Sequence, residues 1–231
     1  MRPADSGAGI RRRAAAHALV DDIDAPELAE ASAHHLFRVL RVADGAVVTV
    51  TDGAGRWRVC RAAAGGLVPD GDVATVAAPA APLTIAVAVP KAERPEWIVQ
   101  KLTEIGVDRI VFLHAERSVV RWDASRGSKH LAKLRRVAAE ALEQSRRVWL
   151  PEVSGPVAAA ALLGQAVAAE PGGRSLTAGD RVIAIGPEGG WTPGELALAQ
   201  ASVGLADQVL RVETAALVAA VSALTLAVGA S

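Results

Sequence analysis

Apolar strands that alternate with amphipathic helices most constrain the fold of this chain. TIAVAVP (84–90) is a continuous apolar run, typical of a strand covered on both faces, and DRIVFLH (108–114) and RVIAIG (181–186) are further strand candidates. Helical segments are predicted at 94–106 and 128–144, where apolar residues recur along one face. Alternation of this kind predicts an α/β fold with a mostly parallel sheet and helices on both faces.

The first third of the chain has a different texture. Short β-like pieces separated by turn signals occur there: VVTV (47–50), RWRVC (56–60) and VATV (73–76). HHLFRVLR (34–41) is predicted to form a short helix or strand within this region. A hinge rich in Pro and Ala follows at 77–83. The sequence therefore predicts two domains, a small β-rich domain over 1–78 and the α/β domain over 79–231.

Composition is typical of a globular protein in a reducing compartment. Of the 231 residues, 51% are hydrophobic and 22% charged, and the formal net charge is zero, which excludes a disordered or strongly basic protein. The one cysteine, Cys60, excludes an internal disulfide, and the five histidines lack the spacing of a metal site. The longest apolar run, 215–228, is expected to be too short to span a bilayer. We therefore expect a cytoplasmic protein without a metal.

The stretch IAIGPEGGWTPGEL (183–196) is the first candidate site. A buried strand leads into a loop with three glycines, and a helix follows that the pair Thr192 and Glu195 is predicted to cap. Ligands bind α/β proteins at such strand ends. The loop lacks the Lys-Ser/Thr pair of a P-loop and the G-x-G-x-x-G spacing, and Glu188 would repel an anion. A cationic ligand with amine and hydroxyl donors, such as S-adenosylmethionine, fits better, although the glycines could also form a plain turn.

Two further stretches carry charge at helix ends. In VLRVETAALVAAVSAL (209–224), Arg211 and Glu213 stand between a predicted short strand (207–212) and a helix (214–228). That helix is apolar on every face, so burial on every side is expected and a site could form at its charged entrance. Glu213 alone could simply stabilise the helix N-terminus. EALEQSRR (140–147), read alone, is typical of a solvated helix end.

Five blocks in this order resemble the RsmE-type family of SPOUT-class RNA methyltransferases, which methylate N3 of a uridine in 16S ribosomal RNA. They are HHLFRVLRVADG, the block KAERPEWIVQKLTEIGVDRIVFLHAERSVV from Lys91, EALEQSRR, IGPEGGWTPGEL and VLRVETAAL. The resemblance covers nearly the whole chain. It implies an N-terminal PUA-like β-barrel that binds RNA, a C-terminal SPOUT domain with a trefoil knot, and a homodimer that acts on the small ribosomal subunit in ribosome biogenesis.

The resemblance also assigns roles to residues. Arg211 and Glu213 are then the candidate catalytic residues. Arg211 would stabilise the negative charge that develops on the uracil or would clamp a phosphate, and Glu213 would act as a base or orienting group. S-adenosyl-L-methionine would contact Leu113, Ile185, Gly186, Pro187, Glu188, Gly189, Gly190, Leu210, Thr214 and Ala215. The candidate RNA contacts are Arg38, Arg41, Lys91, Arg94, Lys101, Arg117, Arg121 and Arg147.

The chain departs from the family pattern at three positions. Arg146 stands where the family commonly has the glycine of EQSGR, and Gln208 and Val212 replace a basic residue and a threonine around VLR. These changes bear on the RNA contacts more than on the cofactor. Other functions therefore stay open: a non-catalytic rRNA-binding or assembly factor, a methyltransferase of another RNA nucleoside, or a small-molecule methyltransferase.

Overall fold

The computed structural model describes residues 7–91 and 94–229. Contacts between Cα atoms divide the chain into two compact units. Among the described residues, the larger unit comprises 80–91, 94–138 and 151–229, and the smaller one comprises 7–79 and 139–150. The end of the long predicted helix thus belongs with the N-terminal region.

A six-stranded parallel sheet forms the centre of the larger unit, in the order β11-β9-β10-β6-β7-β8. The strands are β6 (Thr84–Ala88), β7 (Arg109–His114), β8 (Glu152–Ala158), β9 (Val167–Arg174), β10 (Val182–Ile185) and β11 (Ala201–Val203). All of β6 is buried, as its continuous apolar run predicts. The three predicted strands are confirmed as β6, β7 and β10, while β8, β9 and β11 were not predicted.

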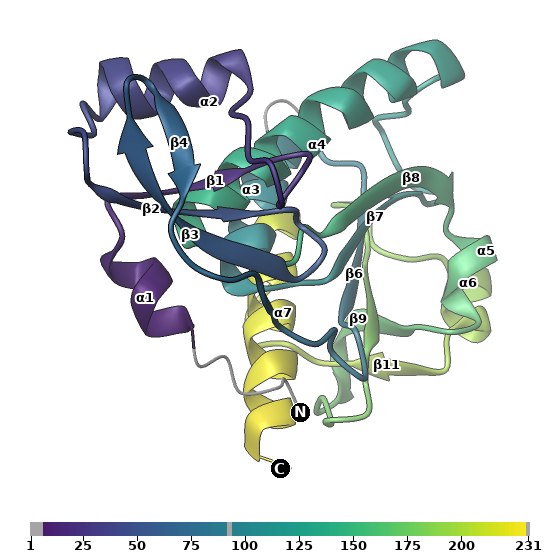
Figure 1. Cartoon of the computed structure of the whole chain (residues 1–231). Helices are drawn as coiled ribbons and strands as arrows, with labels where there is room; N and C mark the ends of the chain where they lie inside the picture. Colours follow the sequence, from purple (N-terminus) through teal and green to yellow (C-terminus); the bar gives the residue numbers. More distant parts are fainter. Residues whose placement is uncertain (1–6, 92–93, 230–231) are drawn as a thin grey trace. The chain divides into compact units, whose positions relative to one another are not determined.

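Helices cover both faces of this sheet, as predicted (Figure 1). They are α3 (Arg94–Ile105), α4 (Ala124–Ser145), α5 (Ala160–Leu163), α6 (Pro193–Leu198) and α7 (Val212–Gly229). α7 packs against α3, β6 and β10, and α5 contacts α6 and β8. The predicted capping box is present at α6, because Thr192 Oγ1 accepts from the Glu195 amide and the Glu195 carboxylate accepts from the Thr192 amide.

The prediction that α7 is buried on every side is wrong. Its buried side consists mainly of alanines, which let the helix lie close to the sheet, and its larger side chains face outward. Val221 is 50% exposed and Val228 78% exposed. In the described part of the chain, α7 is also the one helix long and apolar enough, by length and composition, to cross a membrane, because it extends the run 215–228 to 18 residues.

The prediction of a strand at 207–212 is also wrong. Residues 207–211 form an irregular connection, and α7 begins at Val212 rather than at Thr214. The β-branched residues of VLRV favour a strand locally. Here, however, β11 takes the sheet edge beside β9 before these residues are reached, and they leave the sheet.

The smaller unit is a β-rich domain, as predicted. Its sheet has the path β1-β2-β3-β4, with β5 paired to β3, and only the β1–β2 pair is parallel. The elements are α1 (Ala8–Arg13), β1 (Ala16–Leu19), α2 (Glu30–His34), β2 (Val47–Thr51), β3 (Arg56–Ala63), β4 (Gly66–Pro69) and β5 (Ala74–Thr75). For HHLFRVLR, the structure selects the predicted helix over the strand: α2 ends at His34 and continues into a π-helical turn, η1 (His35–Val39).

The segment EALEQSRR is not a solvated helix end, contrary to its pattern. Glu143 Oε1 accepts hydrogen bonds from the Leu19 amide at 2.9 Å and from Ser32 Oγ at 3.2 Å. The ring of His17 lies between Thr49 Oγ1 and the carbonyl of Arg147, each 2.8 Å from a ring nitrogen. The segment therefore supplies hydrogen-bond partners that β1 needs in the interior of the smaller unit.

Arg146 accounts for one departure from the family pattern. Its φ is +60°, in the left-handed region that glycine adopts at low cost directly after a helix. The Arg146 guanidinium donates to the carbonyls of Arg11 and Ala14, and the Arg146 carbonyl accepts from Arg11 Nε at 3.2 Å. These hydrogen bonds to α1 and the residue after it offset the strain of an arginine in this conformation.

Candidate active site

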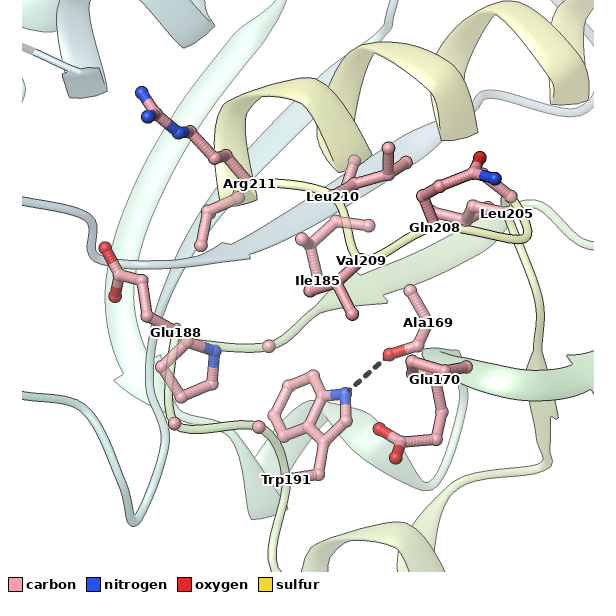
Figure 2. Close-up of a pocket in the computed structure, with 18 residues that line it drawn as sticks. Ala169, Glu170, Ile185, Glu188, Trp191, Leu205, Gln208, Val209, Leu210 and Arg211 are labelled. Carbon is pink, nitrogen blue, oxygen red and sulfur yellow. Dashed lines mark hydrogen bonds between the residues drawn. The ribbon is translucent and has the colours of Figure 1, made fainter.

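A pocket of about 480 Å³ opens in the larger unit at the carboxyl end of β10, beside the middle of β9 (Figure 2). Three segments line it: 169–171 in the middle of β9, 185–191 from the last residue of β10 onward, and most of 205–215 before and at the start of α7. This position at the strand ends is where parallel sheets bind ligands. The volume lies within the range of about 300–1,000 Å³ that holds small-molecule ligands and cofactors.

The glycine loop forms a braced wall of this pocket. Arg117 Nη1 donates to the carbonyls of Gly189 and Trp191, both at 3.1 Å. The buried carboxylate of Glu195 accepts from the Glu116 amide at 2.9 Å, which joins the loop after β7 to the start of α6. Trp191 Nε1 donates to the carbonyl of Ala169 at 3.1 Å (Figure 2). The loop is therefore preorganised from three sides.

Glycine is required at Gly190 and at Gly186 for different reasons. Gly190 has φ +69°, and no atom lies within 4 Å of where its Cβ would stand, so backbone conformation requires it. A Cβ at Gly186 would lie 3.0 Å from the indole of Trp191. Gly186 therefore makes room for Trp191, and it also lines the pocket.

The loop after β7 is fixed by its own hydrogen bonds. Ser118 Oγ accepts from the Ala115 amide at 3.0 Å, and Arg121 Nη2 donates to the Ala115 carbonyl at 3.2 Å. His114 Nε2 accepts from the Trp122 amide at 3.1 Å. Burial, with a smaller contribution from the charge of Arg121, lowers the pKa of His114. A neutral ring suits the acceptor role, so His114 serves the structure of the loop.

The opposite wall, 205–211, is not braced in this way. Within the described ranges, no hydrogen bond is made by residues 205–210. Val209 is 89% exposed, and Gln208 is exposed as well. Figure 2 shows Leu205 and Gln208 at one end of the pocket and Arg211 at the other. The pocket thus has one rigid wall and one wall with few internal constraints.

Charged side chains are concentrated at the Arg211 end. Figure 2 shows the Arg211 guanidinium and the Glu188 carboxylate on the same side, both pointing away from Trp191. Glu170 also lines the pocket, from the middle of β9 and away from the Arg211 end (Figure 2). Glu188 is paired with Arg94 at 3.3 Å, so Glu170 is the pocket-lining carboxylate that favours a cationic ligand. Among the residues that the structure describes, no group of three His, Cys, Asp or Glu could hold a metal ion.

Most of the predicted cofactor residues are brought together. Lining the pocket are Ile185, Gly186, Pro187, Glu188, Gly189, Gly190, Leu210 and Ala215. Leu113 is buried in β7 and Thr214 is exposed in the first turn of α7, and neither lines the pocket. Of the predicted catalytic pair, Arg211 lines the pocket, and Glu213 lies in the first turn of α7.

The predicted RNA contacts are spread over different environments. Arg38, Arg41 and Lys91 are exposed, whereas Lys101 pairs with Glu104 at 2.8 Å. Arg117 and Arg121 use their guanidinium groups on loop carbonyls of the larger unit. Arg94 pairs with two carboxylates, Glu188 and Glu213, and Arg147 is half-buried in the smaller unit.

Sequence reasoning missed several pocket residues. Trp191 could have been found, because it directly follows the glycine loop and few aromatics are available in this chain. Ala169, Glu170 and Pro171 gave no signal, since β9 itself was not predicted. Leu205, Ala206, Val209 and Val212 also line the pocket, from a segment expected to be partly a strand.

Known proteins resemble this chain over both of its units. Residues 77–224 match the family model of the RNA methyltransferase domain, and residues 28–63 match the model of the RNA methyltransferase PUA domain. The ribosomal RNA small subunit methyltransferase E of Mycobacterium bovis is 33% identical over 213 residues, covering 80% of each protein.

Solved structures have a similar fold. A probable rRNA-methyltransferase from Porphyromonas gingivalis aligns with a TM-score of 0.76 and 29% identity, covering 94% of this chain and 100% of that one. A Legionella pneumophila protein, described as a methyltransferase and solved with the cofactor SAM, aligns with a TM-score of 0.74 and 25% identity, covering 89% and 94%. The predicted pairing of a PUA-like domain with an α/β domain is confirmed.

Proposed function

The chain belongs to the family of ribosomal RNA small subunit methyltransferases E, and on that premise we propose that it methylates N3 of a uridine in 16S rRNA, using S-adenosyl-L-methionine. Methylation of small-subunit rRNA with this cofactor is the family's activity. The choice of uridine N3 is the finer part of the proposal. The observation that most supports methyl transfer is a single pocket, which is lined by the braced glycine loop on one side and by Arg211 and the start of α7 on the other.

The pocket suits S-adenosylmethionine by size, charge and surface. The cofactor has a cationic sulfonium and ammonium, which match the carboxylate of Glu170. Its flat adenine suits the apolar surface of Ile185, Trp191 and Leu210. The backbone of the glycine loop is held in place before any ligand arrives, which lowers the entropic cost of binding.

When bound, S-adenosylmethionine supplies a methyl group already activated for transfer. The protein must then place the uridine in line with it and deal with the N3 proton. Arg211 stabilises the negative charge that develops on the uracil as N3 becomes a nucleophile. Glu213, two residues further on, accepts or orients the N3 proton, and its position at the start of α7 stabilises the helix as well.

The PUA-like domain supplies RNA affinity in this proposal. It carries the exposed residues Arg38 and Arg41, and the larger unit adds the exposed Lys91. Such side chains bind phosphates without reading sequence, so we expect affinity for rRNA to fall as salt rises. The assembled small subunit is the proposed substrate, and the cytoplasm is the proposed location.

We also propose a homodimer and a trefoil knot. Support for the dimer comes from the outward apolar side of α7, which adjoins a groove of about 390 Å³ lined by Ser175, Leu176, Gly204, Leu205, Val221, Ser222, Thr225 and Leu226. An apolar patch beside a groove is typical of a surface that a partner covers. Because Leu205 lines both this groove and the pocket, association would take place beside the site. Support for the knot is the family resemblance.

The decisive experiment uses radiolabelled S-adenosylmethionine and small ribosomal subunits from a strain that lacks the gene. The labelled RNA is digested and its nucleosides are separated. Label in 3-methyluridine supports donor, substrate and target atom together. Label in another nucleoside overturns the target atom alone. Binding of rRNA and cofactor with no transfer favours a non-catalytic assembly factor.

A further inference from the structure

Arg94 joins the glycine loop to the first turn of α7 through one guanidinium. As the first residue of α3, it places Nη1 3.3 Å from Glu188 Oε1 and Nε 3.6 Å from Glu213 Oε1. Glu188 belongs to the glycine loop and Glu213 to the first turn of α7. The side chains of Arg94 and Glu188 are 35% and 41% exposed, while that of Glu213 is 16% exposed. The contact to Glu213 is therefore the better shielded of the two.

The second oxygen of Glu213 is left without a protein partner. Oε2 is buried and accepts no hydrogen bond from residues 7–91 or 94–229. A buried carboxylate oxygen without a donor is costly. Glu213 does not itself line the pocket but directly follows Arg211 and Val212, which do, so an N–H group of a base bound at that end of the pocket would supply the missing donor. Arg94 holds Oε1 of the same carboxylate, so the direction of Oε2 depends on Arg94.

We propose that Arg94 is a positioning residue that fixes Glu213 so that its Oε2 accepts the N–H of the target base, while its contact with Glu188 ties that acceptor to the cofactor wall. This inference rests on the proposed function, because the base N–H is the uridine N3–H. Arg94 acts through the two carboxylates and is not itself assigned a contact with the uracil. The cofactor wall and the substrate acceptor then move as one element.

Two double-mutant cycles test the assignment. The first combines Arg94→Gln with Glu213→Gln and measures the single-turnover rate of methyl transfer at saturating cofactor. Arg94→Gln should slow transfer about tenfold in the wild-type background, which is modest for a positioning effect, and less than about twofold when Glu213 is already Gln. The second cycle combines Arg94→Gln with Glu188→Gln and measures the Kd for S-adenosylmethionine, in which we expect coupling of about threefold.

A conservative variant and a matched control separate positioning from folding. Arg94→Lys keeps the charge but cannot span both carboxylates, so it should recover part of the transfer rate. Arg109→Gln breaks an exposed pair with Glu152 in the same unit, 3.6 Å long, and should change neither readout. Multiplicative effects of Arg94→Gln and Glu213→Gln on transfer would overturn the proposal. So would coupling between this pair that appears in the Kd for cofactor instead of the transfer rate.

Failure of the proposed function would be recognised separately. If the wild-type protein binds the cofactor but transfers no methyl group to small subunits, the proposed function is wrong. The proposed role of Glu213 Oε2 as acceptor of the base N–H is then wrong as well. The double-mutant cycle on cofactor affinity would still show whether Arg94 is coupled to Glu188 of the glycine loop. Additivity in that cycle, with normal transfer by the wild type, would overturn the inference alone.

Discussion

Arg117 donates to the carbonyl of Gly189 at 3.1 Å, across 72 positions of sequence, and so links the loop after β7 to the glycine loop. The same nitrogen reaches the carbonyl of Trp191. The sequence had placed Arg117 among candidate RNA contacts, but its guanidinium is used inside the larger unit. A loop held open in this way does not have to be ordered by the cofactor.

Arg117→Ala should therefore weaken cofactor binding without removing a cofactor contact. Loss of two hydrogen bonds to the loop should raise the Kd for S-adenosylmethionine about tenfold. The Arg117→Lys variant can make one of the two hydrogen bonds, so its Kd should lie between those of the wild type and the alanine variant. Isothermal titration checks the order wild type, Lys, Ala. Unchanged affinity in the alanine variant would contradict the bracing role.

Arg211→Ala should separate chemistry from binding. Its guanidinium points away from the pocket interior (Figure 2), so cofactor affinity should change less than about threefold while transfer falls at least about a hundredfold. The two readouts are Kd for the cofactor and the single-turnover rate on small subunits. A variant that transfers normally would rule out charge stabilisation by Arg211.

His17 should make the smaller unit sensitive to acid. Burial, with the charges of Arg11 and Arg146 adding to it, lowers the pKa of His17 from 6.5 to about 4. The unfolded chain then binds the extra proton between these values, so stability is full above about pH 6.5 and is lost as pH falls toward 4. The loss should reach about 2 kcal/mol by pH 5.

Urea unfolding at pH 7 and pH 5 measures this effect. His17→Gln should be less stable than wild type at pH 7 but should lose less of its stability on going to pH 5. The exposed His34 provides the control, because His34→Gln should keep the wild-type pH dependence. An identical pH response in wild type and His17→Gln would contradict the assignment.

Arg146 should reverse the usual order of alanine and glycine. Both Arg146→Ala and Arg146→Gly lose the bonds to α1, but only glycine relieves the left-handed backbone, so the glycine variant should be more stable by about 1 kcal/mol. At the exposed Arg12, inside α1, the order should be the opposite by a similar amount of about 1 kcal/mol. The melting temperatures of the four variants, measured by thermal unfolding, test both orders of stability.

The outward side of α7 should control association. Val221→Glu places a charge on the proposed interface and should shift the protein from dimer to monomer in light scattering at micromolar concentration. Leu198→Glu alters a similarly exposed apolar residue on α6, outside the groove, and should leave the dimer intact. A dimer that survives Val221→Glu would place the interface elsewhere.

Local signals predicted the elements that are fixed by local chemistry. The continuous apolar run of β6 predicted a strand buried on both faces, and every residue of β6 is buried. The capping pair Thr192 and Glu195 predicted where α6 begins. β8 and β9 were missed because each contains residues that usually end strands, Gly155-Pro156 in β8 and Pro171-Gly172 in β9. Their neighbours in the sheet stabilise them, which a window of sequence does not contain.

The roles of arginines were the least predictable part of the site. Arg94 and Arg117 resemble solvent-exposed basic residues in the sequence, yet one spans two carboxylates and the other holds the glycine loop. Charge and position along the chain do not distinguish these uses. Only the fold decides which carbonyl or carboxylate a long side chain can reach.

The contrast between the two pocket walls bears on how this fold diverges. A change in the glycine loop disturbs Arg117, Trp191 or Glu195 and is penalised through stability before any new activity can be selected. Residues 205–210 make no hydrogen bonds within the described part of the chain, so substitutions there alter the pocket at little cost to folding. Substitutions at Gln208 and Val209 can therefore change the shape of the pocket, and with it the substrate preference, with little loss of folding stability and no change in the glycine loop.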